Sequence, residues 1–124
     1  MILDSSFLID LLTEDAGAVA KLEEIDDELL AVPTLVYTEV GVGLVGGSDG
    51  ERRFEAAMDR MTLVPYDAEA ARRAVDIQRT LRENGQPVGA VDAMIAGIAL
   101  ARDQPIVTRN ADEFSRTPAR ISPY

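Results

Sequence analysis

Short apolar segments alternate with longer amphipathic ones along the whole chain, and this alternation restricts the possible folds more than any other feature. The pattern predicts short strands at residues 2–4, 29–32, 62–65, 105–108 and, at a sheet edge, 119–122. Helices are expected at residues 7–12, 16–28, 34–44, 51–61 and 90–101, between Asp67 and Gly85, and as one turn at 110–115. Such alternation is typical of a parallel sheet with helices on both faces, so we expect a single α/β domain over residues 1–124.

Two of the expected helices carry clear packing signals. The helix at 90–101 is almost wholly apolar and should lie in the core. The helix that follows Asp67 has apolar residues at helical spacing, and the inward positions that this spacing predicts are Ala70, Ala74, Ile77 and Leu81.

Three acidic residues stand alone inside apolar segments. Glu39 is the only charged residue within 29–48, Asp92 is the only one within 84–101, and Asp4 ends the first apolar strand. Burying an ionised carboxylate without a partner is costly. A divalent cation shared by the three would supply the missing positive charge. We therefore expect these acids to converge at the carboxyl end of the sheet, where the functional sites of parallel sheets lie.

Each acid also has a purely structural interpretation. Asp92 could cap its helix after Gly89, and Asp4 could cap the first helix through backbone amides. Glu39 could lie on a solvated stripe of its helix. Asp10 sits on a helix whose leucines face inward, and a solvated position is therefore expected for it.

Cysteine and histidine are both absent from the sequence. Their absence excludes disulfides, thiolate metal sites, Ser-His-Asp triads and acid–base catalysis by histidine. Any metal must be held by oxygen ligands, which are the ligands of hard cations such as Mg²⁺ or Mn²⁺.

The chain carries 22 acidic and 12 basic residues, a formal net charge of −10, and Lys21 is its only lysine. An acidic surface ordinarily argues against a nucleic-acid partner. Many acids with almost no lysine also resemble proteins adapted to a salt-rich cytoplasm, where screening makes net charge a weak guide to partners. Because neither a membrane-length apolar run nor a basic signal-peptide start is present, we expect a cytoplasmic protein with no membrane segment.

The chain resembles the PIN-domain ribonucleases of the VapC toxin type over nearly its whole length. The residues that carry the resemblance are MILDSSFLIDLL at the start, TEV around Glu39, VGAVDAMIAGIALA around Asp92, and the closing VTRNADEFSR. It implies an α/β/α sandwich on a short parallel sheet, with Asp4, Glu39 and Asp92 binding Mg²⁺ or Mn²⁺. It also implies that the hydroxyls of Ser6 and Thr108 support the site.

The last motif departs from the family pattern at one position. The family often has an aspartate two residues after the threonine, and this chain has Asn110 there. Asn110 can still coordinate through its carbonyl or fix a metal-bound water, although its spacing from Glu113 is also that of a capping box. Asp112 and Glu113 follow closely and either could replace the missing acid. We take Asn110 and Asp112 as candidate catalytic residues beside the three isolated acids.

The resemblance implies a function and partners. The chain would hydrolyse RNA phosphodiester bonds as the toxin of a toxin–antitoxin pair, form a homodimer, and bind an antitoxin whose C-terminal tail covers the site. Arginines near the mouth of the site would bind RNA, and Arg109 is the nearest to the last motif.

Two other functions stay open at this point. A phosphatase-like domain could use Asp4 as a nucleophile, although no second acid stands beside Asp4 and Lys21 lies in an early helix. A catalytically weak PIN-fold module could bind RNA or protein, and Asn110 is the residue that keeps this alternative open.

Overall fold

The computed structural model describes residues 1–124 and contains a five-stranded sheet in which every neighbouring pair of strands is parallel. In spatial order the strands are β3 (Thr62–Val64), β2 (Ala31–Pro33), β1 (Ile2–Leu3), β4 (Ile106–Thr108) and β5 (Ile121–Pro123). The last strand therefore forms one edge of the sheet, as the sequence predicts, and β1 lies at its centre beside β4.

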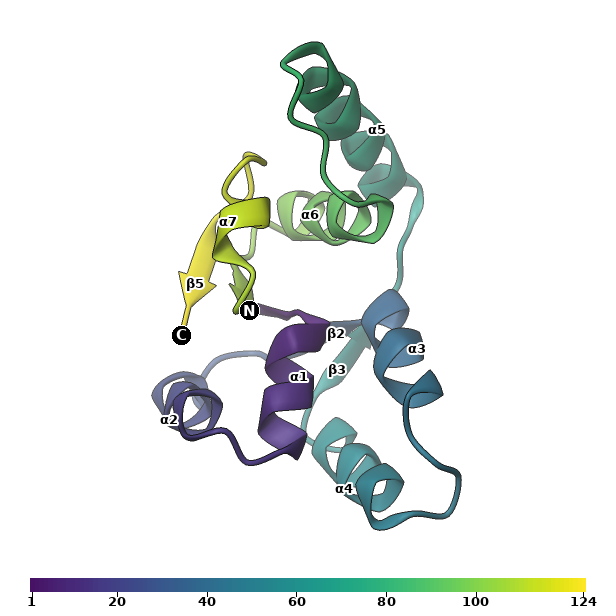
Figure 1. The fold of residues 1–124 in the computed structure, drawn as a ribbon, viewed down its shortest axis with the longest axis vertical. Coiled ribbons are helices and arrows are strands. Elements are labelled where there is room, and N and C mark those ends of the chain that lie inside the picture. The colour runs from purple at the N-terminus through teal and green to yellow at the C-terminus, as the bar shows by residue number, and fades with distance from the viewer.

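Helices cover both faces of this sheet. Their bounds are α1 (Ser5–Leu12), α2 (Ala16–Ile25), α3 (Thr34–Val42), α4 (Asp49–Met58), α5 (Ala68–Glu83), α6 (Ala90–Arg102) and α7 (Ala111–Phe114). Figure 1 shows α1 to α4 on one side of the sheet and α5 and α6 on the other. The expected α/β/α sandwich on a short parallel sheet is confirmed. None of the helices has the length and apolar composition that a bilayer crossing requires.

The core lies on both faces of the sheet, where α1 to α4 pack against one face and α6 packs between the other face and α5. All four residues predicted to face inward from α5 are buried, and so is most of the middle of α6. The two helices approach closely at Gly97, where an added Cβ would lie 2.4 Å from the backbone oxygen of Ala70. Glycine is required at this crossing because no larger residue leaves room for the neighbouring backbone.

The predicted helix at 16–28 is too long. In the structure α2 ends at Ile25, and the N–H of Glu28 bonds to the carbonyl oxygen of Ile25 in a turn. Leu29, which was placed in a strand, is 70% exposed, and its carbonyl oxygen accepts a hydrogen bond from the N-terminal ammonium of Met1. The acidic turn after Ile25 brings the chain back to the sheet, so that strand pairing starts only at Ala31.

Candidate active site

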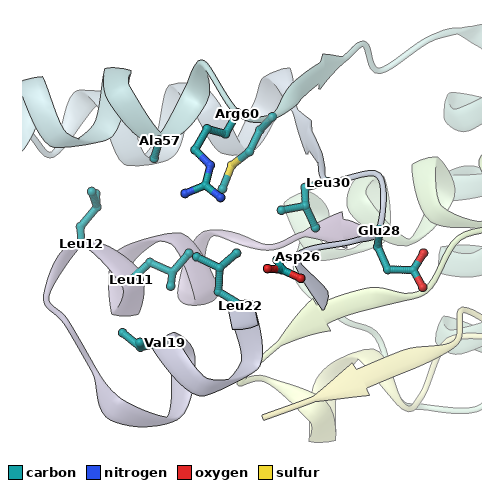
Figure 2. A pocket seen from close by; sticks show the side chains of 10 residues that line it. Leu11, Leu12, Val19, Leu22, Asp26, Glu28, Leu30, Ala57 and Arg60 are labelled. Atoms are coloured by element: carbon teal, nitrogen blue, oxygen red, sulfur yellow. The ribbon is translucent and has the colours of Figure 1, made fainter. Parts of the chain in front are cut away.

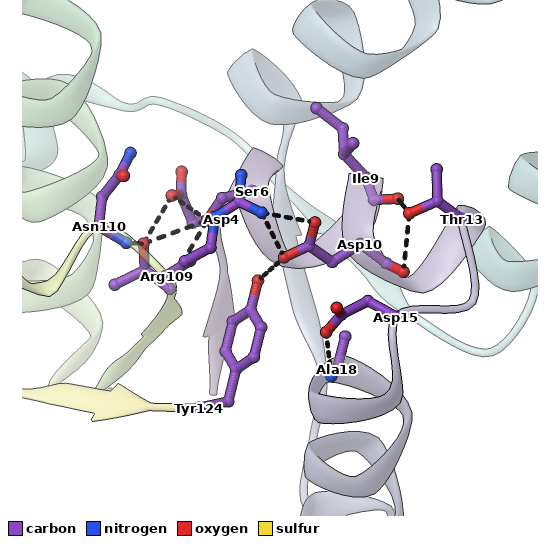
Figure 3. A network of polar contacts seen from close by, with 11 residues as sticks. Asp4, Ser6, Ile9, Asp10, Thr13, Asp15, Ala18, Arg109, Asn110 and Tyr124 are labelled. Carbon is purple, nitrogen blue, oxygen red and sulfur yellow. Dashed lines mark hydrogen bonds and ion pairs between the residues drawn. The ribbon is translucent and has the colours of Figure 1, made fainter.

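Asp4 lies at the centre of a buried network of hydroxyl groups. It follows β1 directly and is 2% exposed. Its Oδ2 accepts hydrogen bonds from Ser6 Oγ at 3.0 Å and Thr108 Oγ1 at 2.8 Å. The backbone N–H groups of Arg109 and Asn110 in turn donate to these two hydroxyls (Figure 3). Asp4 makes no capping bond to α1, so its interpretation as a helix cap is wrong.

The pKa of Asp92 is influenced by three other acidic residues. Asp92 lies in the first turn of α6 and is half-buried. Burial raises the pKa of Asp92, and a hydrogen bond with Glu113 together with the negative charges of Glu113, Asp4 and Glu39 raises it further, to about 7. A nearby negative charge opposes ionisation of a carboxyl group. The negative charges of Asp4, Glu39 and Glu113 thus all act on Asp92, and these four acids make up the carboxylate cluster.

Glu39 lies at the margin of this cluster. Its side chain is exposed on α3, which agrees with the solvated position that the sequence left open. Partial burial of the carboxyl group and the charge of Asp4 nevertheless raise the pKa of Glu39. The side chain is thus solvated but still within the electrostatic influence of Asp4.

The structure places Glu113, and not Asp112, beside Asp92. Glu113 Oε1 accepts a hydrogen bond from the N–H of Gly89 at 2.9 Å. This bond and the bond with Asp92 lower the pKa of Glu113. Asp112 is exposed, and its carboxylate forms no hydrogen bond or ion pair. Of the two acids that could replace the missing aspartate, only Glu113 contacts Asp92.

The geometry of α7 explains this difference. Phe114 is fully buried, which fixes how this four-residue helix is rotated about its axis. Successive side chains on a helix point about 100° apart. Glu113 then faces α6 while Asp112 faces solvent. Asn110 precedes α7 but its side chain makes no capping bond, so the capping-box interpretation is also wrong.

Asp10 is not solvated as the sequence suggests. It is 6% exposed, and its two carboxylate oxygens lie 2.9 and 3.0 Å from Nη1 of Arg109. Tyr124, the last residue of the sequence, donates a 2.7 Å hydrogen bond to Asp10 Oδ2 (Figure 3). Burial and this contact raise the pKa of Tyr124. Sequence reasoning missed Asp10 and Tyr124, because only the fold brings the two ends of the chain together.

The cluster offers oxygen donors of the kind that hard cations prefer, from Asp4, Glu39, Asp92 and Glu113. No three acidic side chains stand close enough around one point to form a complete metal cage. Mg²⁺ usually keeps several water ligands and binds through only one or two carboxylates. The donors present therefore suit a cation that retains part of its hydration shell.

Two surface cavities lie in different environments. A polar cavity of about 480 Å³ adjoins the cluster, and its lining residues are Arg109, Asn110, Ala111, Asp112, Glu113 and Arg116. An apolar cavity of about 380 Å³ lies among α1, α2 and α4 (Figure 2), and none of the four clustered carboxylates lines it. The first cavity can admit a substrate to the carboxylates, whereas the second is separate from them.

The family model of the PIN domain matches residues 1–120. The chain belongs to the PIN domain family. It is 30% identical over 117 residues to the tRNA(fMet)-specific endonuclease VapC of Shigella flexneri, a match that covers 92% of this chain and 89% of the relative.

Solved structures support the VapC-type fold. VapBC2 from Rickettsia felis, bound to a DNA fragment from its promoter, superposes with a TM-score of 0.89 at 19% identity, covering 99% of this chain and 97% of that one. A toxin–antitoxin complex from Klebsiella pneumoniae gives a TM-score of 0.82 at 24% identity, covering 99% and 97%. These structures share the fold, and the match to the VapC of Shigella flexneri at 30% identity confirms the resemblance to the VapC type.

Proposed function

We propose that this VapC-type nuclease is a Mg²⁺- or Mn²⁺-dependent endoribonuclease that hydrolyses RNA phosphodiester bonds. The observation that carries the proposal is that burial, followed by the contact with Glu113 and the crowding of Glu113, Asp4 and Glu39, raises the pKa of Asp92 to about 7. Such crowding is unfavourable for folding, and perturbed carboxylates gather where a site needs them. The name of the Shigella flexneri relative, a tRNA(fMet)-specific endonuclease, points to the same substrate class.

The metal would be held by one or two carboxylates drawn from Asp4, Glu39, Asp92 and Glu113, and would keep water at its other positions. When bound, it would supply Lewis acidity that activates a water molecule and stabilises charge on the phosphoryl oxygens. Ser6 and Thr108 fix the orientation of the Asp4 carboxylate by hydrogen bonding to its Oδ2.

The reaction also needs an acceptor for the proton of the attacking water. Because the chain has no histidine, the proton of the attacking water must pass to a carboxylate or to bulk water. Glu113 contacts Asp92 and lines the polar cavity, so it links the cluster to the side that an RNA strand can reach.

The purified chain should cleave tRNA(fMet) or total RNA when Mg²⁺ or Mn²⁺ is present and should lose this activity in excess EDTA. The reason is that four carboxylates without a cation repel both one another and a polyanionic substrate. Gel analysis of end-labelled RNA measures the cleavage. Full activity in EDTA would contradict the metal dependence, and no activity with any divalent cation would favour the alternative of a binding module.

We also propose that an antitoxin binds the apolar cavity of Figure 2 with one face of an amphipathic helix. Most of the leucines and the valine that line this cavity come from α1 and α2, and Leu30 lies just before β2. The charged residues among its lining are Asp26, Glu28 and Arg60. An apolar groove with charged residues in its lining suits a helix with an apolar face and polar flanks. Homodimerisation, which the resemblance implies, stays a prediction that light scattering can test.

Val19→Glu should weaken antitoxin binding by about tenfold or more, because it places a charge in the apolar groove. Val19 is 39% exposed, so the fold should tolerate the change. Val75→Glu is the matched control, since Val75 is 47% exposed on α5 and lies outside the groove. Calorimetry with the antitoxin of the neighbouring gene measures binding, and RNA cleavage by either variant alone should stay at the wild-type rate. Equal affinity of both variants would place the antitoxin elsewhere.

A further inference from the structure

The carboxylate of Asp10 is buried on α1 but is not part of the carboxylate cluster. Its hydrogen-bond partners come from the far end of the chain, as Arg109 follows β4 and Tyr124 follows β5. The ring of Tyr124 also packs edge-on against Phe7, with 5.1 Å between ring centroids. Asp10 is thus fixed by contacts on two sides (Figure 3).

Arg109 uses only part of its guanidinium to hold Asp10. Both contacts to Asp10 come from Nη1, and the hydrogen bonds of this side chain involve no other nitrogen. A guanidinium has five N–H donors, so those of Nε and Nη2 remain free. The side chain is 61% exposed. Arg109 therefore presents unused donors to solvent.

These free donors stand at the edge of the carboxylate cluster. The backbone N–H of Arg109 bonds to Ser6 Oγ, which itself donates to Asp4. The Arg109 side chain lines the polar cavity together with Arg116 and Glu113. Two arginines thus line the cavity through which an RNA strand can reach the cluster. Guanidinium groups bind phosphate oxygens through paired N–H donors.

Without Asp10, the Arg109 guanidinium would lose the side chain that holds it. A long, flexible cation that lines the same cavity as Glu113 would then be able to pair with that carboxylate, which would occupy oxygens that the site needs and draw the guanidinium away from substrate. The buried Asp10 carboxylate competes for the same guanidinium. Because Asp10 accepts from both Arg109 and Tyr124, it holds the guanidinium at the rim.

We propose that Asp10 and Tyr124 are positioning residues that hold the Arg109 guanidinium at the rim of the site, where its free N–H groups bind a backbone phosphate of the RNA substrate. This inference rests on the proposed RNA-cleaving function. Arg109 is the residue that touches substrate, and the other two act through it.

Asp10→Asn gives the sharpest test, because an effect of net charge and a positioning role of Asp10 predict opposite changes in RNA affinity. Removing a negative charge near an RNA-binding surface should tighten RNA binding if only net charge matters. If Asp10 positions Arg109, the variant should instead bind tRNA(fMet) more weakly, by about tenfold, as a charge-assisted contact to phosphate is lost. The measurement is fluorescence anisotropy of labelled tRNA(fMet) at several salt concentrations, in an Asp92→Asn background that prevents cleavage.

Three further variants in that background complete the comparison. Arg109→Ala should weaken RNA binding at least as much as Asp10→Asn does. It should also reduce the slope of log affinity against log salt by about 1, the change expected when one phosphate contact is lost. Tyr124→Phe keeps the ring on Phe7 but loses the hydroxyl, and should weaken binding by a few-fold. Arg120→Ala is the matched control, since Arg120 pairs with Asp103 before the edge strand and should bind as the background protein does.

Steady-state cleavage in the otherwise wild-type protein separates this inference from the proposed function. Asp10→Asn and Tyr124→Phe should raise KM more than they lower kcat, with folding checked by circular dichroism. The positioning role would be overturned if the wild type is active but Asp10→Asn binds RNA as well as the background protein or more tightly. An unchanged KM in Tyr124→Phe would overturn it as well. An inactive wild type would instead refute the proposed function.

Discussion

Asp92→Asn should lower RNA cleavage at least about a hundredfold and, at the same time, make the metal-free protein more stable at neutral pH. The loss of activity is expected because the substitution removes a ligand charge from the centre of the cluster, and electrostatic contributions of this kind are worth about 10²–10³ in rate. The variant keeps the size and shape of the side chain, so the fold should be intact.

The gain in stability follows from the sign of the pKa shift. Asp92 has a pKa of about 7 in the folded protein, raised from its ordinary value of 3.8 first by burial and then by Glu113, Asp4 and Glu39. A raised folded-state pKa means that ionised Asp92 opposes folding. The wild type therefore loses stability as pH rises from about 4 through about 7, and Asn avoids this loss. Since Asp92 is only half-buried, about 1–2 kcal/mol is a reasonable expectation after solvent screening.

Thermal unfolding at about pH 4 and about pH 8, with EDTA or with Mg²⁺, measures how much ionised Asp92 destabilises the metal-free protein and how much Mg²⁺ stabilises it. The variant should melt a few degrees above the wild type near pH 8 in EDTA, and the difference should vanish near pH 4. Added Mg²⁺ should raise the melting temperature of the wild type only. Asp76→Asn, on an exposed position of α5, controls for the loss of a surface charge. An Asp92→Asn protein with unimpaired cleavage would remove Asp92 from the catalytic site.

Glu113→Gln should lower turnover by about tenfold or more, whereas Asp112→Asn should leave turnover unchanged. The two residues are neighbours on α7, but only Glu113 contacts Asp92. Glutamine can still accept the hydrogen bond from the N–H of Gly89, so this substitution removes the negative charge and keeps the hydrogen bond that holds the side chain in place. Loss of the Glu113 charge should also lower the pKa of Asp92 toward its ordinary value.

The Mg²⁺ dependence of RNA cleavage, measured for both variants beside the wild type, separates these roles. We expect weaker Mg²⁺ activation for Glu113→Gln, and a wild-type curve for Asp112→Asn. The reverse pattern would mean that α7 turns when metal binds and that Asp112 is the fourth acid after all.

The sequence alone predicted the architecture because burial follows a simple period in strands and helices. The alternation of short apolar strands with amphipathic helices was enough to predict a parallel sheet covered on both faces. The four inward positions of α5 follow from the 3.6-residue repeat, and the structure buries all of them. The isolation of Asp4, Glu39 and Asp92 among apolar residues was also visible in sequence, because an acid is rarely kept in such a setting without a function.

Only the tertiary structure decided which acid stands beside Asp92 and what Asp10 does. A four-residue helix is too short for a periodic pattern to show which face is buried, so the choice between Asp112 and Glu113 depended on how Phe114 anchors α7 in the core. The partners of Asp10 lie 99 and 114 residues away along the chain. Contacts between such distant residues leave no local periodicity in a sequence. They exist only because β4 pairs with β1, the strand that leads into α1, and β5 pairs with β4.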